Sequence, residues 1–73
     1  MIAAIEYNHE LHVIKWVGRV KLHVEALTFC NLSINAAEGT FQVTDATFAS
    51  ARPVTVNHAK VVPCSRCRAL IAT

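Results

Sequence analysis

The stretch Pro63-Cys64-Ser65-Arg66-Cys67-Arg68 is the starting point for predicting this fold, because it carries a CxxC motif close to the end of the given sequence. The only other cysteine, Cys30, lies far upstream. In a CxxC motif the chain turns back between the two cysteines, so both sulfurs can point at one metal ion. Three cysteines are an odd number, which suits a metal site completed by a histidine better than it suits disulfide pairing.

Chain length and composition favour a small domain with a staple. The 73 residues predict a single domain over 1–73. In chains this short the hydrophobic core alone supplies only about 3–5 kcal/mol, and a metal ion is one common addition. Apolar residues make up 53% of the sequence and charged residues 16%, which argues against disorder. So much apolar surface is hard to bury in one small core, and we expect a face for a protein partner or for homo-oligomer contacts.

The sequence shows no sign of export or membrane insertion. Its N-terminal segment lacks a basic region, and Glu6 interrupts the apolar run there, unlike a signal peptide. No apolar run approaches the roughly 20 residues that span a bilayer. We therefore expect a cytoplasmic protein that does not contact membranes. Structural disulfides are rare in the cytoplasm, which again favours metal ligation by the thiols.

Alternation of apolar and polar residues predicts strands in the first half of the chain. It is clearest at 20–25, where Val20, Leu22 and Val24 alternate with polar residues. Gly18-Arg19 is either a hairpin turn or a bulge in one long strand. The remaining expectations are strands over 2–7 and 40–45, a loop or short helix over 46–52, an extended piece over 53–56, and a helix from Ser65 to Ala72.

Three cysteines and one histidine are a standard ligand set for structural zinc, which takes four ligands in a tetrahedron. We predict His23 as the histidine ligand, because it lies on the strand that leads to Cys30. The six residues between them allow a reversal that brings the two side chains together. The predicted Zn²⁺ ligands are His23, Cys30, Cys64 and Cys67.

The other histidines and the redox interpretation leave alternatives open. His58 precedes Cys64 by a few residues, in a loop that could fold over the metal, and is the rival fourth ligand. We expect His9 and His12 to be surface residues of a strand. A catalytic thiol motif would open a helix inside a βαβ unit, which this sequence does not show. A thiol redox site, or a CxxC without metal, is therefore the weaker interpretation.

The tail from Asn57 to Leu70 resembles the end of short zinc-binding proteins, of zinc-ribbon or treble-clef type, in actinobacteria and their phages. Those proteins have a histidine on a strand, a cysteine a few residues later, and a late Val-Thr-Cys-Pro-x-Cys before a helix. Leu22-His23-Val24 and Thr28-Phe29-Cys30 match the upstream half of that pattern. Pro63 stands before the first cysteine of the CxxC here, rather than after it. The resemblance implies metal binding and no particular activity.

The expected fold class is α+β: a small zinc-stapled domain with an antiparallel β-sheet and a C-terminal helix. No glycine-rich phosphate loop and no paired carboxylates occur, and a closed zinc site has no open position to activate water. We therefore expect no enzyme. The first hypothesis is a non-enzymatic adaptor, for example a phage-type regulator, that binds a protein partner through an apolar sheet face or an edge strand.

Two further functions remain as alternatives. The first is a zinc protein that binds nucleic acid through the basic residues around the CxxC and near Trp16. The net charge of +2 is too small to carry that function by itself. The second is a CxxC thiol redox protein.

Overall fold

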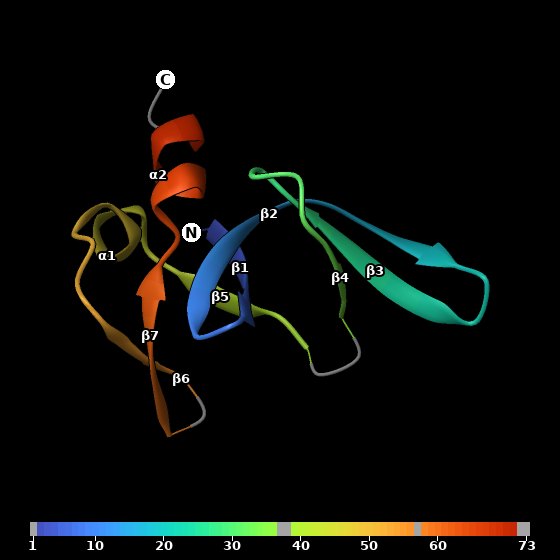
Figure 1. Cartoon of the computed structure of the whole chain (residues 1–73), viewed down its shortest axis with the longest axis horizontal. Helices are drawn as coiled ribbons and strands as arrows, with labels where there is room; N and C mark the ends of the chain where they lie inside the picture. Colours follow the sequence, from blue (N-terminus) through green and yellow to red (C-terminus); the bar gives the residue numbers. More distant parts are fainter. Residues whose placement is uncertain (1, 37–38, 57, 72–73) are drawn as a thin grey trace.

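The computed structural model describes residues 2–36, 39–56 and 58–71, and it has an α+β fold (Figure 1). The expected antiparallel sheet with a C-terminal helix is confirmed. The elements in chain order are β1 (Ile2–Tyr7), β2 (Glu10–Val20), β3 (His23–Thr28), β4 (Ser33–Asn35), β5 (Phe41–Val43), α1 (Asp45–Ala49), β6 (Val54–Val56), β7 (Ala59–Pro63) and α2 (Ser65–Ile71).

Strand β2 organises the sheet, whose main path runs β4-β3-β2-β1-β5. Its first residues pair antiparallel with β1, up to the Ala4–Val13 pair. On the opposite edge, Glu10 and Leu11 pair with β7, which runs parallel to them. The second half of β2 pairs antiparallel with β3. The two halves of this one strand therefore lie in different surroundings.

The β2–β3 hairpin turns later than the sequence pattern suggested. Gly18 and Arg19 lie inside one long strand, as one of the two alternatives had it, and the turn falls at Lys21 and Leu22. The register irregularity lies between Ile14 and Trp16 instead of at Gly18. The alternation over 20–25 thus crosses a turn, and the leucine within it is fully exposed at 101%.

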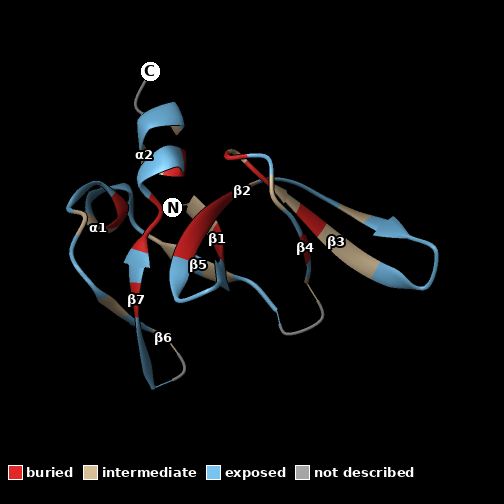
Figure 2. Cartoon of the chain, viewed as in Figure 1, coloured by how far each residue is buried: buried red, intermediate tan, exposed pale blue. Residues whose placement is uncertain are grey.

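We call residues 15–27 the arm. They comprise the second half of β2, the turn and most of β3, and they project away from both helices (Figure 1). Figure 2 shows that exposed and half-buried residues predominate along the arm, whereas the buried part of β2 lies nearer the helices. Strand β4 pairs with β3 along the other edge of the arm.

The main core lies between the first half of β2, β1, β7 and the two helices. Its buried members are Ala4, Leu11, Val13, Cys30, Phe48, Val61, Cys64 and Cys67. Helix α1 contributes the fully buried Phe48 and begins at an N-cap, Thr44, whose hydroxyl oxygen accepts from the Thr47 amide at 3.0 Å. A second, smaller cluster of Ile5, Ala26 and Ile34 lies at the base of the arm.

The other elements expected from the sequence are present as the predicted helix or strand, but their first and last residues differ. The strand expected over 40–45 is shorter, because Thr44 caps α1. The predicted terminal helix is α2, which ends at Ile71 within the described residues; Ala72 lies outside them. Among the helices of the described residues, none is long and apolar enough to cross a bilayer.

Candidate metal centre

Four buried side chains meet at the centre of the main core. Their potential ligand atoms, one imidazole nitrogen and three thiol sulfurs, all lie within 4.8 Å of one another. The residues are His12, Cys30, Cys64 and Cys67, none more than 8% exposed. The structure thus brings together the three cysteines chosen from the sequence and joins to them a histidine that the sequence analysis had placed on the surface.

The first half of β2 positions this cluster through its backbone. The Leu11 carbonyl accepts a hydrogen bond from the Cys64 amide at 2.8 Å, which ties the CxxC to the strand. The Val13 carbonyl accepts from the Phe29 amide at 3.1 Å, which ties down the turn that carries Cys30. The residue between these two anchor points is His12. Its side chain therefore lies where the CxxC and the turn converge.

The imidazole of His12 is oriented as a metal ligand requires. Its Nε2 lies 3.4 Å from the Tyr7 carbonyl oxygen, and its Nδ1 lies 3.4 Å from the Cys30 sulfur. A carbonyl can only accept, so Nε2 carries the proton and the Nδ1 lone pair faces the sulfurs. Histidine ligands in proteins commonly donate their second ring N–H to a backbone carbonyl in this way.

Cys30 lies in a tight turn that directly follows β3. The Asn31 amide donates to the Thr28 carbonyl at 3.0 Å, and Asn31 itself has a φ of 69°, which asparagine tolerates better than most residues. The Thr28 hydroxyl accepts from the Leu32 amide at 3.0 Å, so its own hydrogen is free to point at the Cys30 sulfur, 3.2 Å away. The turn therefore supplies a donor to that sulfur.

The two CxxC thiols are presented by the start of α2. Cys64 directly precedes the helix, and its carbonyl accepts the Arg68 amide at 2.9 Å, closing the first turn. Cys67 lies within that turn and is fully buried. The exposed Ser65 and Arg66 between them face water. The helical turn thus directs both sulfurs to the inside of the molecule.

Two of the thiols, those of Cys30 and Cys67, have pKa values shifted in opposite directions. Burial raises the pKa of the Cys30 thiol, but hydrogen bonds from Thr28, the other two thiols and the Leu32 amide outweigh burial and place that pKa below its ordinary value. Burial raises the pKa of the Cys67 thiol to about 12, and the neighbouring thiols add to that rise. Packed thiols cannot all ionise without a cation, which would stabilise every thiolate at once.

The spacing of the cluster fits a tetrahedral ion. With Zn–S of about 2.3 Å and Zn–N of about 2.0–2.1 Å, a tetrahedral nitrogen and sulfur stand about 3.5 Å apart. The 3.4 Å between His12 Nδ1 and Cys30 Sγ matches that separation. The residues present therefore suit a metal ion that takes three thiolates and one imidazole.

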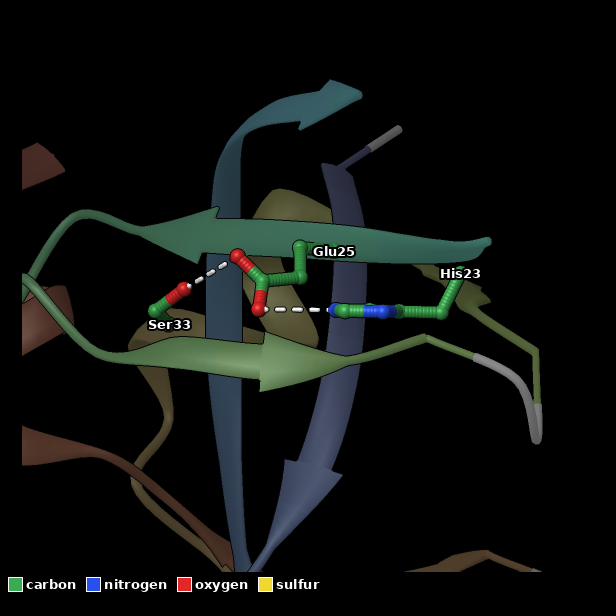
Figure 3. A network of polar contacts seen from close by, with 3 residues as sticks. All are labelled: His23, Glu25 and Ser33. Carbon is green, nitrogen blue, oxygen red and sulfur yellow. Dashed lines mark hydrogen bonds and ion pairs between the residues drawn. The ribbon is translucent and has the colours of Figure 1, made fainter. Parts of the chain in front are cut away.

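The prediction of His23 as a ligand is corrected by the structure. His23 begins β3, next to the hairpin turn, and its side chain is 42% exposed. At about 3.3 Å per strand residue, β3 carries Cys30 some 15–20 Å away from it. His23 Nε2 instead lies 3.0 Å from Glu25 Oε1, and Ser33 Oγ donates to Glu25 Oε2 at 2.9 Å (Figure 3).

This surface network has no catalytic geometry. In a hydrolytic triad the histidine stands between the serine and the carboxylate, so that it can take the serine proton. Here the carboxylate of Glu25 stands between Ser33 and His23 (Figure 3). The network joins β3, which carries His23 and Glu25, to β4, which carries Ser33. His23 is thus held by Glu25 at the hairpin end of β3, away from the thiols.

The rival ligand His58 also lies outside the cluster. It is exposed in the turn between β6 and β7 and has a φ of 66°. His9 is exposed, as expected, but it lies in the β1–β2 turn instead of on a strand. His12 lies on a strand, but the expectation that it is a surface residue is wrong. A signal for His12 was present: it lies in the run Leu11-His12-Val13-Ile14, typical of a strand buried on both faces, where a polar side chain needs a partner.

A pocket of about 480 Å³ opens beside the core, within the size range of small-molecule sites. Its lining comes mainly from β1, β2 and the two helices, with Asp45 and Arg68 as its charged groups. None of the four cluster residues lines it. The pocket and the cluster are therefore separate features of the structure.

Comparison with known proteins found no matching family model, no matching curated protein and no matching solved structure.

Proposed function

We propose that the cluster holds one structural Zn²⁺ and that the protein is a non-enzymatic adaptor built on this metal-stapled core. The observation that carries the metal is the convergence of four buried ligand atoms within 4.8 Å. Three thiolates and one imidazole in a tetrahedron are a zinc set, because soft sulfur ligands exclude magnesium and calcium. Bound zinc would supply a fixed cross-link between β2, the β3–β4 turn and α2.

The closed surroundings favour a structural over a catalytic or redox role. Four protein ligands leave a tetrahedral ion no open position for water or substrate. The CxxC sulfurs belong to residues that are 4% and 0% exposed, whereas a redox-active cysteine needs an accessible sulfur. Both facts support a centre that holds the fold together and leaves function to the surface.

The arm supports an adaptor role for that surface. Its exposed large apolar residues are Trp16, Val17, Val20 and Leu22, with exposed fractions between 37% and 101%. Gathered on one projecting hairpin, they form the kind of apolar surface that marks a protein contact. A staple in the core keeps such an arm folded while the arm itself contributes little burial.

The nucleic-acid alternative is less well supported by the arm. Trp16 is exposed for stacking, but the Glu25 carboxylate lies on its face of the sheet, and Arg19 lies on the opposite face. A phosphate backbone would be repelled from the face that could stack its bases. Binding to single-stranded DNA or RNA at low salt, lost at high salt, would favour that alternative over the adaptor.

Elemental analysis of the purified protein tests the metal directly. We expect one zinc per chain, and loss of the folded far-UV spectrum when a strong chelator removes it. Cobalt in place of zinc should give the absorption of a tetrahedral thiolate site. Recovery of the fold on adding zinc back is the control for irreversible damage. A metal-free protein that melts cooperatively at the same temperature would refute the proposal.

A further inference from the structure

The outer edge of the arm is an unpaired strand edge. Within β2, residues 16–20 pair with β3 on one side, beyond the register irregularity between Ile14 and Trp16. On the other side, β1 reaches only as far as Val13, and no other strand of the described residues covers the edge beyond it. Figure 1 shows this edge of β2 as the free border of the projecting hairpin.

The direction of the backbone groups follows from the pairing on β3. The Ala36 amide donates to the Val24 carbonyl at 2.9 Å, so Val24 bonds away from β2. In an antiparallel ladder bonded and non-bonded pairs alternate, so Arg19, opposite Val24, and Val17, opposite Ala26, do not bond to β3 either. The N–H and C=O groups of Val17 and Arg19 therefore point out of the open edge.

Side chains along this edge combine apolar and basic character. Trp16 is 53% exposed and Val20 37% exposed on one face, while Val17, 48% exposed, and Arg19 lie on the other. Lys15 and Lys21 flank the stretch, which gives three basic residues. The one acid of the arm is already engaged by His23 and Ser33. The free edge of β2 therefore carries a net positive charge and has apolar residues on both faces.

We infer that residues 15–20 of β2 bind an extended acidic segment of a partner protein, which joins the sheet as an added strand. Main-chain hydrogen bonds to Val17 and Arg19 give such a complex its affinity, and alternate side chains give it specificity. Partner residues on the Arg19 face are acidic, and those on the Trp16 face are apolar. The inference rests on the proposed adaptor function and names its partner chemistry.

A second copy of the chain fits this edge poorly. Two β2 edges paired antiparallel would place Lys15, Arg19 and Lys21 of one copy near the same basic residues of the other. Like charges that face each other across strands are destabilising. Basic residues at a free edge also protect it from self-association, which leaves an acidic strand as the matching partner.

Three synthetic peptides added to the zinc-loaded protein test the inference. The first alternates glutamate and valine over six residues. The second has lysine in place of glutamate. The third has the composition of the first in two blocks, three glutamates followed by three valines.

The measurement is the exchange rate of individual backbone amide hydrogens, followed by NMR. In the free protein the Val17 and Arg19 amides exchange fast, and those of Gly18 and Val20, bonded to β3, exchange slowly. The alternating acidic peptide alone should slow Val17 and Arg19 about fivefold or more.

Two variants and one control separate edge pairing from simple charge attraction. Val17→Pro removes an outward N–H without touching the ladder to β3, where edge proline is tolerated, and should abolish the protection. Arg19→Glu keeps the backbone and should weaken binding by about tenfold. Lys60→Glu, an equal charge reversal at an exposed position of β7, should leave the affinity unchanged. One zinc per chain in each variant shows that the core is intact.

Four other results would overturn the inference that an acidic strand pairs with the edge of β2. No protection of Val17 and Arg19 at about 1 mM alternating peptide overturns the inference. Equal protection by the block peptide overturns it too, because charge alone then explains the effect. Shifts of the Trp16 indole without edge protection overturn edge pairing but leave the adaptor function standing. Binding of oligo(dT) to the arm, with no peptide bound, would overturn both.

Discussion

The two halves of β2 belong to one continuous strand and yet differ sharply in burial. In the first half, Leu11, His12 and Val13 are 0%, 2% and 3% exposed; in the second, Trp16 and Val17 are 53% and 48% exposed (Figure 2). The first half has β1 and β7 along its edges and the helices nearby, while the second has β3 alone. Burial on this strand is therefore set by what packs around it, not by its own composition.

The two halves of β2 are also stabilised by different interactions. The first half is anchored by the four-residue cluster and the main core, which contains Phe48 of α1. The arm is held by its hairpin hydrogen bonds, the small Ala26 cluster and the surface network around Glu25. Changes in the first half should therefore affect the whole fold, and changes in the arm should remain local.

The largest expected effect comes from His12→Ala, compared with His23→Ala. Structural zinc contributes an apparent ~10–16 kcal/mol in small zinc-binding peptides, as much as the whole stability of a typical domain. His12→Ala should therefore purify with less than one zinc per chain and without a cooperative melting transition. His23→Ala should keep its zinc and its melting temperature within a few degrees. Elemental analysis and thermal circular dichroism measure both.

Replacement by another ligand distinguishes coordination from packing at this position. His12→Cys would complete a four-cysteine set, which also binds zinc, and should restore the metal and the fold. If His12→Cys stays unfolded in excess zinc while His23→Ala is the variant that loses metal, the assignment of the histidine ligand in the structure is wrong.

Local sequence features were sufficient to predict most elements and the three cysteines. Alternation predicted β5, a strand was expected over 2–7 where β1 lies, and the helix-forming tail after Pro63 predicted α2. A CxxC brings its own two sulfurs together by local geometry, so Cys64 and Cys67 could be paired without knowledge of the fold. Cys30, as the remaining thiol, followed by elimination.

The choice between His12 and His23 could not be made locally. It depends on the parallel pairing of β7 with the start of β2, which joins residues some fifty positions apart and brings the CxxC beside Leu11. It also depends on the turn at Lys21 and Leu22, which places His23 at the far end of the hairpin. Alternation fixes the face of a strand but not its partner, so proximity in sequence to Cys30 misled the prediction.

Truncation of a large apolar side chain should reduce the free energy of unfolding much more in the main core than in the arm. Phe48→Ala removes a fully buried ring from the main core and should reduce the free energy of unfolding by about 3–5 kcal/mol. Leu22→Ala removes a side chain that is fully exposed, and should change it by less than about 0.5 kcal/mol. Urea unfolding at a fixed zinc concentration measures both. Equal costs would show that the arm packs against something in solution.

Glycine at the hairpin turn should stabilise the arm. Lys21 has a φ of 56°, a left-handed conformation that costs a side-chain-bearing residue about 1 kcal/mol. Lys21→Gly should therefore raise the stability of the hairpin by up to about that amount, seen as slower exchange of the Gly18 and Val20 amides. The matched control is Lys60→Gly in β7, where the φ is not positive and glycine should destabilise by about 0.5–1 kcal/mol. Faster exchange in Lys21→Gly would mean that the turn has a different conformation.

The smallest expected effect is that of Glu25→Gln on the arm. Hydrogen bonds from His23 and then Ser33 hold the pKa of the Glu25 carboxyl below its ordinary value of 4.5. A carboxyl whose pKa is lowered by folding stabilises the folded state in full above its ordinary pKa, and this contribution fades as the pH falls through the lowered value. At pH 7.5 Glu25→Gln should therefore accelerate exchange of the arm amides, while the zinc content stays at one. Glu10→Gln, on the first half of β2, should leave the arm unchanged. If Glu25→Gln instead altered zinc retention, the arm and the metal centre would be coupled, and the two halves of β2 would not be independent.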